Sequence, residues 1–99
     1  MDGVDLHREL AFQALLFADW KQTRQIAREP DRYWERNKLL GSHPSVGRVD
    51  TYMFASGVLH WVIAMNLSPQ WREQFQLISI SMQANVVHQN YQIGLGLRF

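Results

Sequence analysis

Residues 45–69, SVGRVDTYMFASGVLHWVIAMNLSP, decide the fold of this chain. From Tyr52 to Leu67 no Lys, Arg, Asp or Glu occurs, and the stretch is long enough for a helix of five or so turns. Ser45 is a typical N-cap. Ser68-Pro69 combines an N-cap with a first-turn proline, so that one helix ends and the next begins at once. The stretch therefore predicts a helix that runs to about Asn66.

Two further helices are expected on either side of this stretch. The segment from Pro69 to roughly Gln92 carries an apolar face made of Trp71, Phe75, Ile78, Met82 and Val86. The segment from about Asp5 to Arg28 has no Gly or Pro, and apolar residues recur at helical spacing at Leu6, Leu10, Ala14 and Phe17. We therefore predict an all-α fold of three long helices, with a helix 1–2 loop over 30–44 and a short extended C-terminal tail.

Composition excludes several classes of protein. A chain of 99 residues forms a single small domain. The absence of Cys excludes disulfides, Cys-type zinc sites and Cys nucleophiles, and a net charge of +1 gives no electrostatic case for nucleic-acid binding. No phosphate loop, hydrolase motif or metal-ligand spacing is present, so we expect no cofactor, no metal and no catalytic residue.

The charges are unevenly placed along the chain. Seven of the ten basic residues lie between 21 and 48, whereas the half from 51 to 99 holds only Arg72, Glu73 and Arg98. This asymmetry predicts a membrane boundary, with segment 45–66 crossing the bilayer of a bacterial inner membrane. The positive-inside rule then places loop 21–48 in the cytoplasm. The alternative is a solvated basic face on a soluble helical protein.

Polar residues within the apolar segments are the candidate functional residues, because polar groups that face lipid are costly. Asp19, Gln22 and Thr23 share one helical face, and His60 lies in the middle of the most apolar segment. Asn85 and His88 belong to a neutral polar stripe with Ser81 and Gln92, and Asn90 follows. We expect a polar cluster inside the bundle drawn from Asp19, Gln22, Thr23, His60, Asn85, His88 and Asn90.

The loop between the first two helices offers a second set of candidates. Glu35, Asn37 and His43 bring together a carboxylate, an amide and an imidazole. Loops often carry binding sites, although caps and turns are the commoner use of such side chains. We expect these residues to shape the loop.

Several blocks together resemble a known family. Asp19-x-x-Gln22-Thr23 is followed by Glu35-x-Asn37-x-Leu39-Leu40-Gly41-x-His43-Pro44-Ser45, and both patterns are similar to those of small bacterial and phage or prophage proteins taken to be membrane proteins. Lys38 and Ser42 depart from that pattern, in which Pro and Glu are expected. The resemblance implies a membrane setting and a phage-like origin, and it implies no reaction.

These observations lead to one functional expectation and two alternatives. We expect a non-enzymatic, membrane-embedded helical protein that acts through an envelope partner or as a homo-oligomer. A soluble helical interaction module is the first alternative. An intramembrane protein that handles a metal ion or protons, through residues such as His60 and His88, is the second.

Overall fold

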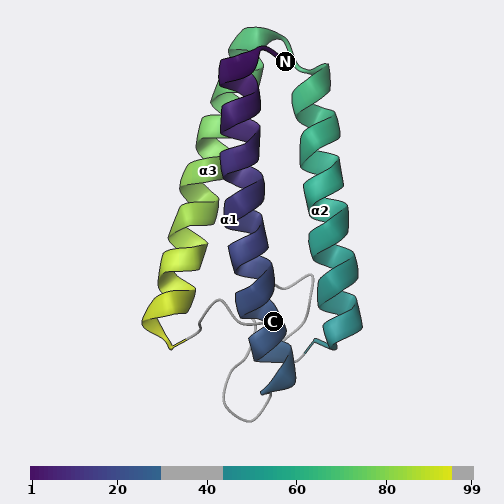
Figure 1. The fold of residues 1–99 in the computed structure, drawn as a ribbon, viewed down its shortest axis with the longest axis vertical. Helices are drawn as coiled ribbons and strands as arrows, with labels where there is room; N and C mark the ends of the chain where they lie inside the picture. The colour runs from purple at the N-terminus through teal and green to yellow at the C-terminus, as the bar shows by residue number, and fades with distance from the viewer. Residues whose placement is uncertain (30–43, 95–99) are drawn as a thin grey trace.

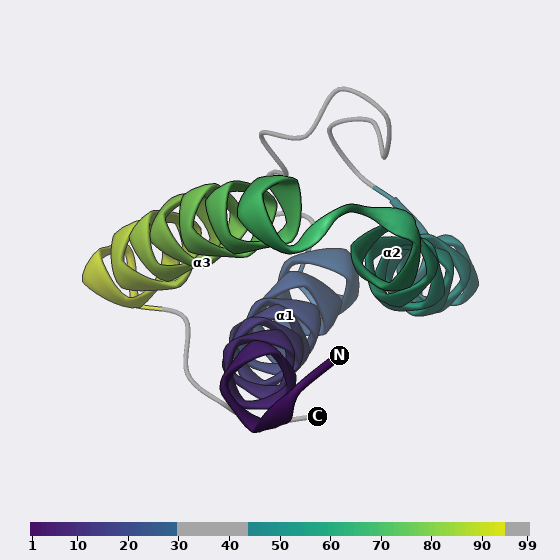
Figure 2. The same cartoon turned by 90° about the horizontal axis from the view of Figure 1, so that it is seen from above.

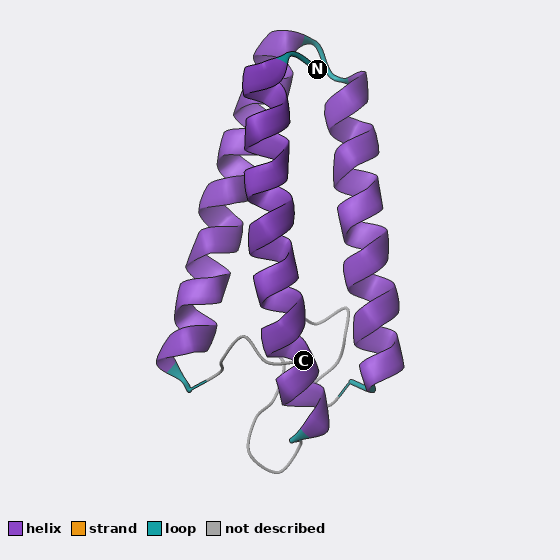
Figure 3. Ribbon diagram, in the orientation of Figure 1, coloured by secondary structure: helices purple, strands orange, loops and turns teal. Residues whose placement is uncertain are grey.

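The computed structural model describes residues 1–29 and 44–94, and within these ranges it consists of three helices and no strand (Figures 1 and 3). Helix α1 spans Gly3–Arg28, α2 spans Val46–Asn66 and α3 spans Pro69–Gln92. The all-α prediction is therefore confirmed. The loop candidates Glu35, Asn37 and His43, and most of the expected C-terminal tail, lie outside the described residues.

Side-chain caps explain where α1 and α2 begin, whereas Ser68 makes no side-chain capping hydrogen bond before α3. The Asp2 carboxylate accepts from the Asp5 backbone N–H at 2.8 Å, and the Asp5 carboxylate accepts from that of Asp2 at 3.4 Å. This capping box starts α1 two residues before the predicted Asp5. Ser45 Oγ accepts from the Arg48 N–H at 3.1 Å, as predicted, and α3 begins with Pro69 directly after Ser68.

Helix α1 is the centre of the molecule. Viewed from above, α2 and α3 flank α1, and they diverge from the short turn that joins them (Figures 1 and 2). Both pack along α1 but make few contacts with each other. The molecule is consequently elongated, with extents of 44 × 23 × 20 Å. Because α2 and α3 meet only near their turn, much of each flanking helix faces outward.

The interior contains unusually many polar groups. The apolar core is a small cluster of Phe12, Leu16, Val49 and Met53. Large apolar side chains, in contrast, are exposed along all three helices. Within residues 1–29 and 44–94, buried polar or charged residues equal the buried residues of the apolar core in number, six of each, whereas protein interiors are mostly apolar. The polar ones are Asp5, Glu9, Gln22, Thr23, His60 and Gln76.

The apolar stripes that predict α1 and α3 as helices mostly face outward, with the partly buried Phe75 of α3 as an exception. Leu6, Leu10 and Phe17 of α1 are exposed, and so are Ile78 and Met82 of α3. The inner face of α1 follows a different stripe, in which steps of four and three residues alternate; its members are Asp5, Glu9, Phe12, Leu16, Asp19, Thr23 and Ile26. The helices are as expected, but their polar sides form the contacts.

Candidate functional site

A buried histidine–carboxylate pair lies between α1 and α2. His60 Nδ1 is 2.8 Å from Glu9 Oε2, and the two side chains are 7% and 0% exposed. An ionised carboxylate only accepts hydrogen bonds, so Nδ1 is the donor in the state in which Glu9 is ionised. His60, the one histidine of the most apolar segment, thus contacts Glu9, the most buried carboxylate of α1.

Two phenylalanines hold the His60 ring in place. Phe12 of α1 stacks on one side, with ring centroids 3.6 Å apart and an interplanar angle of 10°. Phe75 of α3 stacks at 4.3 Å and 25°. The other ring nitrogen, Nε2, is buried and has no hydrogen-bond partner among the described residues. The ring is therefore fixed in orientation, with one nitrogen engaged and one unused.

Glu9 receives hydrogen bonds from all three helices. Besides His60 of α2, Gln13 of α1 donates to Oε2 at 2.9 Å and Gln76 of α3 donates to Oε1 at 3.2 Å. The Gln13 amide also reaches the Gly57 carbonyl at 3.0 Å, and that of Gln76 reaches the Asp5 carbonyl at 3.0 Å. Three donors satisfy the buried charge and join the helices at one point.

Ion pairs extend this network to the turn between α2 and α3. Arg72 donates to Asp5 Oδ2 at 2.8 Å and to the carbonyls of Ala64 and Leu67 at 2.7 and 2.8 Å. Arg8 pairs with the same carboxylate, and its Nε donates to Gln76 Oε1 at 2.9 Å. We call the whole set the Glu9 network; its members are Asp5, Arg8, Glu9, Gln13, His60, Arg72 and Gln76.

A second polar group, the Asp19 cluster, joins the middle and lower parts of α1 and α3. It consists of Asp19, Gln22, Thr23, Gln83 and Asn90. Asp19 Oδ1 accepts from Thr23 at 3.0 Å and from Asn90 at 3.2 Å, and its Oδ2 accepts from Gln83 at 2.7 Å. Asn90 also donates to Gln22 Oε1 at 3.1 Å. The cluster borders a cavity of about 440 Å³ between the diverging helices.

A third contact fixes α1 to the beginning of α2. The Trp20 indole N–H donates to Asp50 Oδ1 at 2.8 Å, and Arg24 Nη1 lies 2.6 Å from both oxygens of the same carboxylate. This contact closes the end of the bundle opposite the α2–α3 turn.

The structure divides the predicted polar cluster. Asp19, Gln22, Thr23 and Asn90 lie together as expected. His60 belongs instead to the Glu9 network, and Asn85 and His88 are exposed on α3. The side of α3 that meets α1 carries Gln76, Gln83 and Asn90 at seven-residue intervals, so the stripe with Asn85 and His88 is turned away.

Sequence reasoning missed Glu9, Gln13 and Gln76, which surround His60. The signal was present in the spacing, since Asp5, Glu9 and Asp19 share the inner stripe of α1 and Gln76, Gln83 and Asn90 share that of α3. Within residues 1–29 and 44–94, no group of three or more His, Asp or Glu side chains is arranged to hold a metal ion.

None of the three described helices combines the length and the apolar character that crossing a bilayer requires. Comparison with known protein families, curated proteins and solved structures finds no match for this chain. Its function is therefore argued from its own geometry.

Proposed function

We propose that this chain is a non-enzymatic, membrane-embedded helical protein that acts through an envelope partner or a second copy of itself. The observation that carries the proposal is the distribution of side chains, with polar groups gathered inside the bundle and large apolar groups outside. In water, folding normally produces the reverse arrangement. In lipid, polar groups turn inward because they find no partner outside the protein.

The outer surface of α2 supports a lipid-facing role. Its exposed side chains form a continuous uncharged stripe over three turns, made of Phe54, Val58, Leu59, Val62 and Met65. Exposed apolar patches of this kind mark contact surfaces for lipid or protein. Hydropathy averaged along a helix counts inward and outward residues alike, so the exposed face is the better guide to the surrounding medium.

The interior also suits a bundle in lipid. Apolar side chains gain little from burial there, because lipid tails are as apolar as the core, and hydrogen bonds between helices hold such bundles together. The Glu9 network and the Asp19 cluster provide these bonds at two levels of the bundle. They compensate for the small apolar core described above.

Charge gives the proposed orientation. Lys21, Arg24, Arg28 and Arg48 lie near the end where α1 finishes and α2 begins (Figure 1). The positive-inside rule places this end in the cytoplasm of a bacterium and the α2–α3 turn on the far side of the inner membrane. The family resemblance of the sequence adds a phage-like origin to the proposal.

Membrane fractionation with a reporter fused to each terminus tests this proposal. We expect the chain to stay in the membrane fraction after carbonate and high-salt washes. The N-terminal reporter should lie outside the cytoplasm and the C-terminal reporter inside, because α1 begins and α3 ends at opposite ends of the bundle (Figure 1). A folded monomer in the cytosol without detergent would contradict the proposal and support the soluble helical module.

A second candidate function is proton handling at His60, and the Glu9–His60 pair favours it. A fixed imidazole with one nitrogen bonded to a carboxylate and the other unused is suited to gain and lose a proton. Titration of the His60 ring by NMR tests this candidate. A ring that binds a proton between pH 5 and 8 while the fold is retained supports it, and a ring that does not titrate in that range refutes it.

A further inference from the structure

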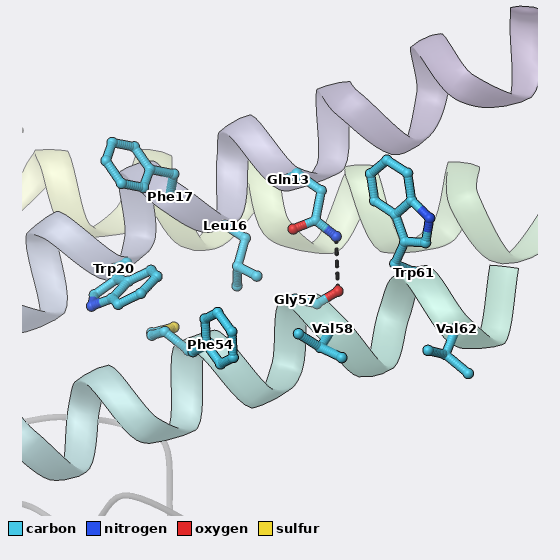
Figure 4. A pocket seen from close by; sticks show the side chains of 10 residues that line it. Gln13, Leu16, Phe17, Trp20, Phe54, Gly57, Val58, Trp61 and Val62 are labelled. Atoms are coloured by element: carbon cyan, nitrogen blue, oxygen red, sulfur yellow. Dashed lines mark hydrogen bonds between the residues drawn. The ribbon is translucent and has the colours of Figure 1, made fainter. Parts of the chain in front are cut away.

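An apolar groove runs between α1 and α2 on the side away from the Asp19 cluster (Figure 4). Its volume is about 470 Å³, which is within the usual range of small-molecule sites. The walls include Leu16, Phe17 and Trp20 from α1, and Phe54, Val58 and Trp61 from α2. Among the residues that the structure describes, none with a charge lines the groove. Its chemistry therefore fits a flexible hydrocarbon chain.

Two of the polar side chains that border the groove already donate their hydrogen bonds within the protein. The Gln13 amide donates to the Gly57 carbonyl and to Glu9, and the Trp20 indole N–H donates to Asp50. Gly57 makes the first of these contacts possible, because a Cβ at this position would lie 2.9 Å from Gln13 Oε1 and 3.3 Å from Leu16 Cδ2. With these donors engaged, the lining is mostly aliphatic and aromatic and offers mainly dispersion contacts.

Positive charge lies at one end of the groove. Lys21 Nζ is 5.1 Å from the centroid of the Phe17 ring, which is part of the wall. Arg24 follows one turn later, paired with Asp50, and Arg28 and Arg48 are exposed at the same end of the bundle. At the other end of the groove, Trp61 and Val62 are uncharged. An amphiphile with an anionic head therefore meets cations when its head lies at the Lys21 end of the groove.

We infer that this groove binds one acyl chain of an anionic phospholipid, with the phosphate directed to the Lys21 end. The inference rests on the proposed membrane function, because it takes its ligand from the bilayer. It deepens that function by naming the lipid class and the place where it binds. Anionic lipids are enriched on the cytoplasmic side of the membrane, where they attract basic segments, and this is the side proposed for Lys21.

Quenching of tryptophan fluorescence tests the inference. The full chain, with Trp34 and Trp71 replaced by Phe, is titrated in non-ionic detergent micelles with phosphatidylglycerol brominated on its acyl chains. Bromine then quenches only Trp20 and Trp61, and only at close range. We expect saturable quenching at a low fraction of lipid. Brominated phosphatidylcholine, which has no net charge, should need a higher fraction, and Lys21→Gln should remove most of this difference.

Neighbouring residues of α2 supply a matched pair of variants. Val58 and Leu59 are 49% and 59% exposed, but only Val58 lines the groove. Val58→Glu places a carboxylate among the apolar walls and should raise the lipid fraction for half-quenching by about tenfold or more. Leu59→Glu should change it by less than about twofold. Phe54→Ser, at another exposed wall position, replaces Val58→Glu if the latter fails to fold.

The outcomes separate the two proposals. If the chain fractionates as a soluble protein but still shows saturable quenching in micelles, the membrane function is refuted and lipid binding in the groove is supported. A chain that stays in the membrane fraction, with quenching that rises linearly with lipid and is equal in all variants, would refute the groove. If Val58→Glu instead dissociates a dimer and leaves quenching unchanged, the groove binds a second copy and the inference is wrong.

Discussion

Replacing His60 by Phe tests whether the Glu9 network holds the helices together. The Phe ring still stacks between Phe12 and Phe75, so the substitution chiefly removes the 2.8 Å hydrogen bond to Glu9. Glu9 is fully buried and keeps only the amides of Gln13 and Gln76. A hydrogen bond to a charged group contributes about 1.5–3 kcal/mol, so we expect the free energy of unfolding to fall by that amount.

A double-mutant cycle isolates the pair from its surroundings. Glu9→Leu leaves His60 Nδ1 without its acceptor, whereas Gln13 and Gln76 keep the backbone carbonyls of Gly57 and Asp5. The single variant should therefore lose about as much stability as His60→Phe. The double variant removes both polar groups and leaves neither unpaired. Its free energy of unfolding should therefore lie at most about 1 kcal/mol below that of either single variant.

Denaturant unfolding in detergent micelles, followed by circular dichroism, measures all four proteins. We expect a coupling energy of about 1.5–3 kcal/mol between positions 9 and 60, as for a charge-assisted hydrogen bond. If the two losses simply add, with a coupling below about 0.5 kcal/mol, the pair contributes nothing of its own and the reasoning is refuted.

Three further predictions concern other parts of the bundle. Asp50→Asn should lower the free energy of unfolding by about 1 kcal/mol, because the amide loses the charge that pairs with Arg24. An unchanged free energy would contradict this. Gly57→Ala displaces Gln13 and should lower the free energy of unfolding by about 1 kcal/mol. Gly47→Ala, with open space around its Cβ, should raise the free energy of unfolding by about 0.5–1 kcal/mol in the same assay. Equal effects would argue against the close contact between Gly57 and Gln13. Asn90→Ala should lower the free energy of unfolding by about 1–2 kcal/mol, because Asn90 is hydrogen-bonded to α1. His88→Ala should lower it by less than about 0.5 kcal/mol, because His88 is exposed. The reverse order would refute the orientation of α3.

The ends of the helices were readable from the sequence because capping chemistry is local. Ser45 caps a backbone N–H within one turn, and Pro69 fits the first position of a helix without any capping bond from Ser68. The structure begins α2 and α3 where these residues predict. The start of α1 was missed by two residues because its capping box uses Asp2 and Asp5, instead of the commoner Ser or Thr with Glu. The capping rule misplaces this helix start only because the two capping residues are unusual.

Which face of each helix is buried was harder to predict, because helical periodicity does not show whether the surrounding medium is water or lipid. Helix α1 carries one apolar stripe through Leu6, Leu10 and Phe17, and another stripe that mixes Glu9 and Asp19 with Phe12 and Leu16. Both have helical spacing, and only packing decides which one is buried. The same ambiguity on α3 led to Asn85 and His88 being placed inside, whereas Gln83 and Asn90 face α1.

The Glu9–His60 pair depends on a relation that no local pattern contains. The two residues are 51 positions apart, and each looks ordinary within its own segment. Their meeting requires α1 and α2 to pack antiparallel at one particular register, since a shift of one turn, about 5.4 Å, would leave both groups buried without a partner. Apolar contacts around Phe12 and Met53 tolerate such shifts more easily, because they have no direction. We therefore infer that the polar interior selects the register of the bundle, and that its residues are kept for specificity of packing as much as for stability.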